Sequence, residues 1–104
     1  MFILTKKQIR PNTSVEFASM QTFADTDPAF KPHFFSTYLS TGKMVSSEDS
    51  VSENGLEKTT VTIWADSESY NAFKEDPICI PIMQLYATHC VDNGIDNLTE
   101  SQTV

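Results

Sequence analysis

Glycine is scarce in this sequence, with three copies among 104 residues, and Gly42, Gly55 and Gly94 stand far apart. Isolated glycines exclude the glycine-rich loops that cradle phosphate groups. The G-x-S-x-G pattern of a nucleophile elbow is also missing, which argues against a serine nucleophile of that type. No apolar run approaches the roughly 20 residues that a membrane-spanning helix needs. The N-terminal stretch MFILTKKQIR lacks the features of a signal peptide, so we expect a cytoplasmic protein.

Basic residues are few as well. Seven lysines and arginines against 14 aspartates and glutamates give a formal net charge of −7. Nucleic acids and anionic membrane surfaces both attract clustered positive charge, so we expect neither as a partner. A chain of this length forms one domain, here residues 1–104, with a core that needs no disulfide or metal.

Residues that bind transition metals are limited to two histidines and two cysteines, namely His33, His89, Cys79 and Cys90. No two of them have the C-x-x-C or H-x-x-x-H spacing of a metal site, so we predict no bound metal. A helix between the cysteines would hold them beyond the roughly 7 Å Cα separation that a disulfide allows. We therefore expect two free thiols.

The middle of the sequence carries the strongest local signals. Asn54-Gly55 predicts a type I′ turn, because both central residues of that turn need positive φ. Residues 56–65 alternate as a strand rich in β-branched residues, and we expect this strand to pair across the turn with one over residues 44–52. Asp66 follows as the N-cap of a short helix.

The beginning of the sequence predicts a strand and a helix. Phe2–Ile9 alternates between apolar and polar residues, as a strand does. Thr13 and Glu16 have the spacing of a capping box, in which each side chain satisfies an amide at the start of a helix. We therefore predict a helix over Ser14–Ala24.

Residues 29–41 admit two interpretations. Phe30, Phe34, Phe35 and Tyr38 suit either a helix after Pro32 or an extended run. The polar residues between them are typical of strands, so we favour an extended segment from Phe34 onward.

The last third of the sequence predicts a longer helix from about Ile80 to Asp92. Pro81 suits its first turn, and the glycine of Asn93-Gly94 suits its end. The remaining residues form either a final edge strand through Leu98 and Val104 or a loose tail.

This element order predicts an α+β fold. Strand, helix, two strands, one or two helices and a final strand make the ferredoxin-like βαββα(α)β arrangement, with an antiparallel sheet and helices on one face.

The segment WADSESY, residues 64–70, resembles the aromatic turn into the second helix of the dimeric α+β-barrel superfamily. The similarity is greatest to the antibiotic biosynthesis monooxygenases and their uncharacterised relatives. This resemblance implies a homodimer in which two sheets pack face to face. Because the superfamily includes cofactor-free oxygenases, heme degraders and stress proteins, the resemblance does not imply one reaction.

Two observations refine what the resemblance implies. Small heme-degrading members use an Asn, a Trp and a His, for which Asn12, Trp64 and His89 are the nearest types here. Asn12 follows the first strand and His89 lies one helix too late, so we expect no heme and no other cofactor.

The strand after Gly55 is apolar on both faces, which independently favours a homodimer, and we assign its interface to the face that bears Trp64.

His89 is the one candidate for a catalytic base. It falls among apolar residues of the predicted helix over residues 80–92, where an unpaired imidazole is costly. Either a backbone carbonyl or a hydroxyl satisfies it within the core, or it faces a ligand.

Three functions remain open. The first is binding of a small apolar or amphipathic molecule in an aromatic cleft between helices and sheet. The second is a cofactor-independent monooxygenase-like enzyme with His89 as its base. The third is a structural protein whose core is filled by its own side chains. The expected ligand-binding residues are Phe23, Phe35, Trp64, Tyr86 and His89.

Overall fold

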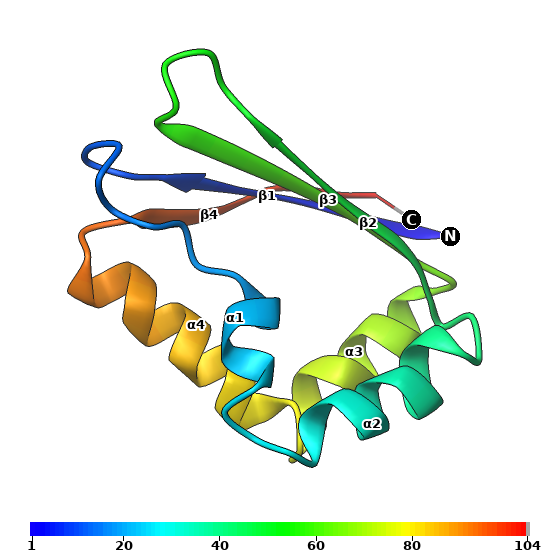
Figure 1. Cartoon of the computed structure of the whole chain (residues 1–104). Helices are drawn as coiled ribbons and strands as arrows, with labels where there is room; N and C mark the ends of the chain where they lie inside the picture. Colours follow the sequence, from blue (N-terminus) through cyan, green and yellow to red (C-terminus); the bar gives the residue numbers. More distant parts are fainter. Residues whose placement is uncertain (104) are drawn as a thin grey trace.

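One antiparallel sheet of four strands forms a layer of the molecule, and all the labelled helices lie on the same face of it (Figure 1). The computed structural model describes residues 1–103. Its strands are β1 (Phe2–Ile9), β2 (Met44–Val51), β3 (Glu57–Trp64) and β4 (Asp96–Thr103). Their order in the sheet is β2-β3-β1-β4. The predicted α+β, ferredoxin-like class with helices on one face is confirmed.

Five helical elements cover the sheet. They are α1 (Met20–Ala24), α2 (Phe30–Phe34), the π-helix η1 (Phe35–Leu39), α3 (Ser67–Glu75) and α4 (Ile80–Asp92). The longest, α4, has 13 residues. Within residues 1–103, none of these helices is both long and apolar enough to cross a membrane.

Several local predictions are confirmed by individual contacts. The Asp66 side chain caps α3 by accepting a hydrogen bond of 2.7 Å from the Ser69 amide. Gly94 has φ +68 beyond the end of α4, and the following amide of Ile95 donates to the Cys90 carbonyl. The last segment is an edge strand, because β4 pairs with β1. Val104 lies outside the described residues.

The β2–β3 hairpin forms as predicted, but its turn is of another type. Gly55 has φ +73, whereas Asn54 does not have the positive φ that a type I′ turn requires. The turn runs from Ser52 to Gly55, with the Gly55 amide donating to the Ser52 carbonyl at 2.9 Å. The Asn54 side chain holds this geometry by accepting hydrogen bonds from the Leu56 amide and the Ser52 hydroxyl.

The predicted helix over Ser14–Ala24 is wrong in its first half, because only Met20–Ala24 is helical. The side chains of Gln8 in β1 and of Arg10, just after β1, bind the backbone of residues 15–18 instead. Arg10 Nη1 donates to the Val15 carbonyl, and Gln8 bonds both the amide and the carbonyl of Ala18. These side-chain hydrogen bonds replace the backbone hydrogen bonds that a helix starting at Thr13 would have made.

The predicted extended segment from Phe34 onward is also wrong, since α2 and η1 are helical through Leu39. Phe30, Phe34 and Tyr38 are spaced four residues apart and stack in sequence, with ring centroids 5.5 and 5.6 Å apart. This helical spacing buries the aromatic rings in one row. The hydroxyl group of Ser36, between Phe34 and Tyr38, donates to the His33 carbonyl within the helical segment.

The two faces of the sheet differ, and the face assigned to the dimer interface is wrong. Trp64 is only 2 % exposed and belongs to the core between sheet and helices. Thr60 and Thr62 lie on the same, helix-covered side. The opposite face bears Val61 and Ile63, which no other element of residues 1–103 covers (Figure 1).

Candidate functional site

A cavity of about 800 Å³ lies between the helix-covered face of the sheet and the helices. Alternate residues of β3 form one wall of it, and residues of α1, α2 and α4 contribute the other. The β3 residues are Lys58, Thr60, Thr62 and Trp64. Since strands rise about 3.3 Å per residue, the wall from Trp64 to Thr60 is about 13 Å long. A cavity of this volume accommodates a small organic molecule.

The Trp64 end of the cavity is aromatic. The Trp64 ring packs against Phe73 and Tyr70, with centroids 5.2 and 5.7 Å away, and edge-on against Tyr38. Phe30 and Phe34 of α2 also line the cavity. Trp64 Nε1 is buried and has no hydrogen-bond partner among the described residues. This end therefore offers aromatic surface and one unused donor.

The other end of the cavity is polar. Lys58 Nζ lies 3.6 Å from Asp49 Oδ2, and the Thr60 hydroxyl donates to Asp49 Oδ1 at 2.7 Å. Lys6 of β1 lies beside them and is partly buried. Its ammonium group lies 5.7 Å from the centroid of the Tyr86 ring.

Lys6 differs from Lys58 because no carboxylate group among residues 1–103 pairs with its ammonium group, whereas Asp49 pairs with that of Lys58. Within the described part of the chain its ammonium group makes no ion pair and no hydrogen bond. Burial lowers the pKa of Lys6, because water no longer solvates the charged form fully. The nearby Cys90 opposes this shift only in part. An ammonium group in this position favours an anionic or hydrogen-bond-accepting neighbour.

The structure brings together only part of the predicted ligand-binding set. Trp64 and Tyr86 line the cavity. Phe35 projects into solvent with 61 % of its surface exposed, because η1 places it on the outer side of the helix. Phe23 packs against the core and His89 rather than lining the cavity.

His89 lies outside the cavity lining, which corrects the prediction that it faces a cleft. Its Nε2–H donates to the Glu16 carbonyl at 2.7 Å, and its ring lies 5.8 Å from that of Phe23. Asn93 Nδ2 lies 3.5 Å from the remaining nitrogen, Nδ1. A backbone carbonyl thus satisfies His89, as the structural alternative held.

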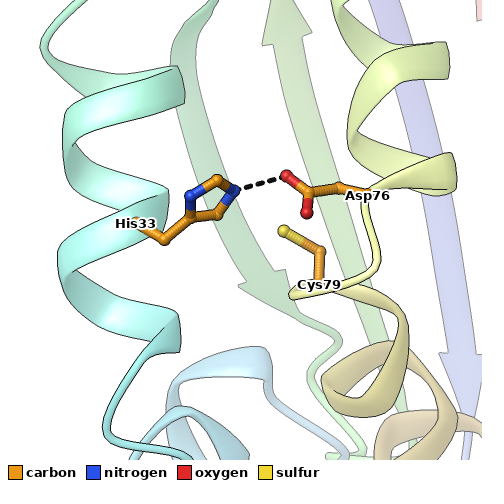
Figure 2. Close-up of side chains that lie close together, drawn as sticks. All are labelled: His33, Asp76 and Cys79. Atoms are coloured by element: carbon orange, nitrogen blue, oxygen red, sulfur yellow. Dashed lines mark hydrogen bonds and ion pairs between the residues drawn. The ribbon is translucent and has the colours of Figure 1, made fainter.

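A second group of chemically active side chains lies apart from the cavity lining (Figure 2). His33 of α2 faces Asp76 and Cys79 of the loop between α3 and α4. His33 Nε2 lies 2.5 Å from Asp76 Oδ2, which also accepts a hydrogen bond of 2.7 Å from the Tyr38 hydroxyl. The second carboxylate oxygen, Oδ1, accepts from the Ile78 amide at 2.9 Å. Asp76 therefore connects α2 and η1, through His33 and Tyr38, to the loop between α3 and α4.

The electrostatics of this group exclude nucleophilic catalysis by the Cys79 thiol. Partial burial opposes ionisation of Asp76, but the hydrogen bonds from His33 and Tyr38 outweigh it and lower its pKa to about 2. Burial, with the Asp76 carboxylate adding to it, raises the pKa of Cys79 to about 12. The thiol is therefore protonated at neutral pH, and the imidazole is paired with Asp76. The group is not an activated nucleophile.

Sequence reasoning did not identify this second group, because 43 positions separate His33 from Asp76. Its one local signal is the D-P-I-C segment. There the Cys79 amide donates to the Asp76 carbonyl at 3.0 Å, which turns both side chains toward α2. Lys6 was likewise missed, since its neighbours come from another strand and from α4, as Thr60 and Tyr86 do.

Solved structures share the whole arrangement of elements. A dimeric ferredoxin-like protein from an uncultured marine organism matches with a TM-score of 0.63, covering 100 % of this chain and 93 % of its own, at 10 % identity. SnoaB, a cofactor-independent oxygenase from Streptomyces nogalater, matches with a TM-score of 0.56 over 99 % and 91 % of the two chains, at 7 % identity. At these identities the likeness concerns the fold. No protein-family model and no curated protein sequence matches the chain.

Proposed function

We propose that the protein binds a small amphipathic molecule in the cavity between sheet and helices. The observation that carries this proposal is the partly buried Lys6 ammonium group at one end of the cavity, which has no carboxylate partner among the described residues. A buried charge without a partner is costly, and an anionic or strongly accepting group of a ligand would relieve that cost.

The remainder of the ligand is apolar in this proposal. Trp64, Phe73 and Phe34 supply aromatic surface at the far end. Aromatic rings bind flat apolar groups through stacked or edge-to-face contacts. The unpartnered Trp64 Nε1 supports a hydrogen-bond acceptor on this part of the ligand.

The experiment uses 8-anilinonaphthalene-1-sulfonate, an aromatic anion with both properties. Trp64 is the only tryptophan, so energy transfer from it to the bound dye reports occupancy of this cavity. Lys6→Met is expected to weaken dye binding about 10-fold or more, because hydrogen bonds to charged groups contribute about 1.5–3 kcal/mol. Lys43→Met is the matched control, since Lys43 lies outside the cavity lining.

Two results would contradict this function. One is equal dye affinity in Lys6→Met and the wild type. The other is equally tight binding of the uncharged analogue N-phenyl-1-naphthylamine, which would leave Lys6 without a role. Native mass spectrometry of the purified protein would identify a co-purified natural ligand.

The oxygenase alternative has less support. SnoaB shares the fold and is a cofactor-independent oxygenase, but His89, the base that this alternative requires, is bound to the Glu16 carbonyl outside the cavity.

Both cysteines are free, which supports our expectation of a reducing, cytoplasmic location.

We also propose that the protein is a homodimer joined through the open face of its sheet. Ile3 of β1 lies directly opposite Ile63 of β3, and Thr5 lies opposite Val61. Ile3, Ile63 and Val61 form a small apolar patch on this open face, and Glu48 of β2 borders it opposite Val61. A second molecule packed on this face would bury the patch. The marine protein of the same fold is dimeric, which supports the proposal.

A further inference from the structure

The side chains of His33, Asp76 and Cys79 offer one nitrogen, one oxygen and one sulfur ligand atom, all within 4.8 Å of one another (Figure 2). None of the three lines the cavity, so this group is independent of the proposed ligand site. We propose that these three residues bind a Zn²⁺ ion.

The donor set has the chemistry that zinc prefers. Imidazole, carboxylate and thiolate are its usual protein ligands, at about 2.0–2.3 Å. Ligand atoms of a tetrahedral site then lie roughly 3–4 Å apart, a spacing that atoms within 4.8 Å reach through small side-chain movements. The ion would replace the direct contact between His33 Nε2 and Asp76 Oδ2. The thiolate favours zinc over magnesium or calcium, which prefer oxygen.

Surrounding groups already orient the ligands. Histidines that bind metals donate their second ring N–H to a nearby acceptor. In His33, Nε2 points toward the group, while Nδ1 lies 3.4 Å from the Thr37 hydroxyl. The Ile78 amide and the Tyr38 hydroxyl both hold the Asp76 carboxylate. This second layer of contacts sets the direction of the donors before any ion arrives.

The three side chains differ in exposure, and this difference defines a route by which an ion can enter. Cys79 is fully buried, the Asp76 side chain is 11 % exposed, and the His33 side chain is 27 % exposed. An ion therefore enters past His33 and reaches the sulfur last. The thiol proton leaves to solvent as the zinc–sulfur bond forms. A water molecule would complete the fourth position.

Co²⁺ titration of the full chain tests this proposal, after chelator treatment under reducing conditions. We expect one Co²⁺ per chain, with a thiolate-to-cobalt charge-transfer band in the near ultraviolet that Zn²⁺ abolishes. Cys79→Ser should lose the band, while the matched Cys90→Ser should retain it, since Cys90 is equally buried but lies in the second core cluster. Thr37→Val should weaken Co²⁺ binding about 10-fold, because it removes an outer partner of the ligating histidine.

A second pair of variants keeps the test valid if Cys79→Ser does not fold. His33→Gln changes a partly exposed side chain and should abolish Co²⁺ binding, while His89→Gln should not. A wild-type protein without the charge-transfer band would overturn the proposal. A band that persists in His33→Gln would also overturn it, because the metal would then be held elsewhere.

Discussion

The side-chain amide of Gln8 pairs with the backbone of Ala18 through two hydrogen bonds. Gln8 Oε1 accepts from the Ala18 amide at 2.8 Å, and Gln8 Nε2 donates to the Ala18 carbonyl at 2.9 Å. The same nitrogen donates to the Tyr86 hydroxyl at 2.6 Å. With 2 % of its surface exposed, Gln8 joins β1, the irregular segment before α1, and α4.

Gln8→Leu should therefore destabilise the protein strongly. The substitution leaves the buried Ala18 amide without a partner, which costs about 1–3 kcal/mol, whereas the Ala18 carbonyl keeps the hydrogen bond of 3.3 Å from Lys58 Nζ. We expect the free energy of unfolding in urea to fall by about 1–3 kcal/mol. Gln84→Leu, on the exposed side of α4, should change it by less than about 0.5 kcal/mol. Equal losses in the two variants would show that the Gln8 contacts contribute little.

Tyr86 makes the stability depend on alkaline pH. Burial raises its pKa to about 12, so the folded protein retains the phenol proton where the unfolded chain, with a pKa of about 10, has lost it. The contribution of Tyr86 is thus complete below pH 10 and is lost as the pH rises toward 12. In Tyr86→Phe we expect a shallower fall of the unfolding free energy between about pH 10 and 12. Identical slopes for this variant and the wild type would contradict the assignment.

Gly55→Val should be more harmful than Gly42→Val, although both glycines have nearly the same φ, +73 and +76. Either substitution places a β-branched residue in a left-handed conformation, at about 1–2 kcal/mol or more. At Gly55 a Cβ would also lie 3.3 Å from Thr13 Cγ2, whereas at Gly42 no atom lies within 4 Å. Thermal unfolding should therefore show a larger loss for Gly55→Val. An equal or smaller loss of thermal stability for Gly55→Val would mean that the segment around Thr13 moves away from the new side chain at little energetic cost.

Signals confined to a few adjacent residues predicted the fold well. Asp66, Gly94 and the alternation of Phe2–Ile9 each act through neighbours in sequence, and each prediction is confirmed. Predictions failed where side chains outside a segment decide its conformation. Thr13 lost its helix because Gln8 and Arg10 bind the backbone that follows it.

The same distinction applies to the candidate site. Trp64 was identifiable as a large aromatic residue on a strand, and Tyr86 as part of an apolar helical face. Lys6 is one of two adjacent lysines in β1, and nothing in the sequence indicates which of them enters a cavity. His33 and Cys79 become neighbours only because α2 packs beside the loop between α3 and α4 (Figure 2). Such proximity is a property of the tertiary fold.

Ile63→Lys tests the proposed dimer. The wild type should sediment as a dimer at micromolar concentration, and the variant as a monomer, because a lysine at Ile63 would place a charge beside Ile3 in the apolar part of the interface. Val91→Lys is the control, since Val91 is exposed on α4, on the other side of the sheet. A monomeric wild type, or a dimer that tolerates Ile63→Lys, would refute the interface.

His89→Ala separates stability from ligand binding. The substitution removes an exposed hydrogen bond to the Glu16 carbonyl and the contact with Phe23, so we expect a loss of about 0.5–1.5 kcal/mol in the free energy of unfolding. Binding of 8-anilinonaphthalene-1-sulfonate should be unchanged, because His89 lies outside the cavity lining. Lys6→Met should show the opposite pair of effects, weaker dye binding with little loss of stability. If His89→Ala instead weakened dye binding at unchanged stability, His89 would reach the ligand, and the oxygenase alternative would regain its base.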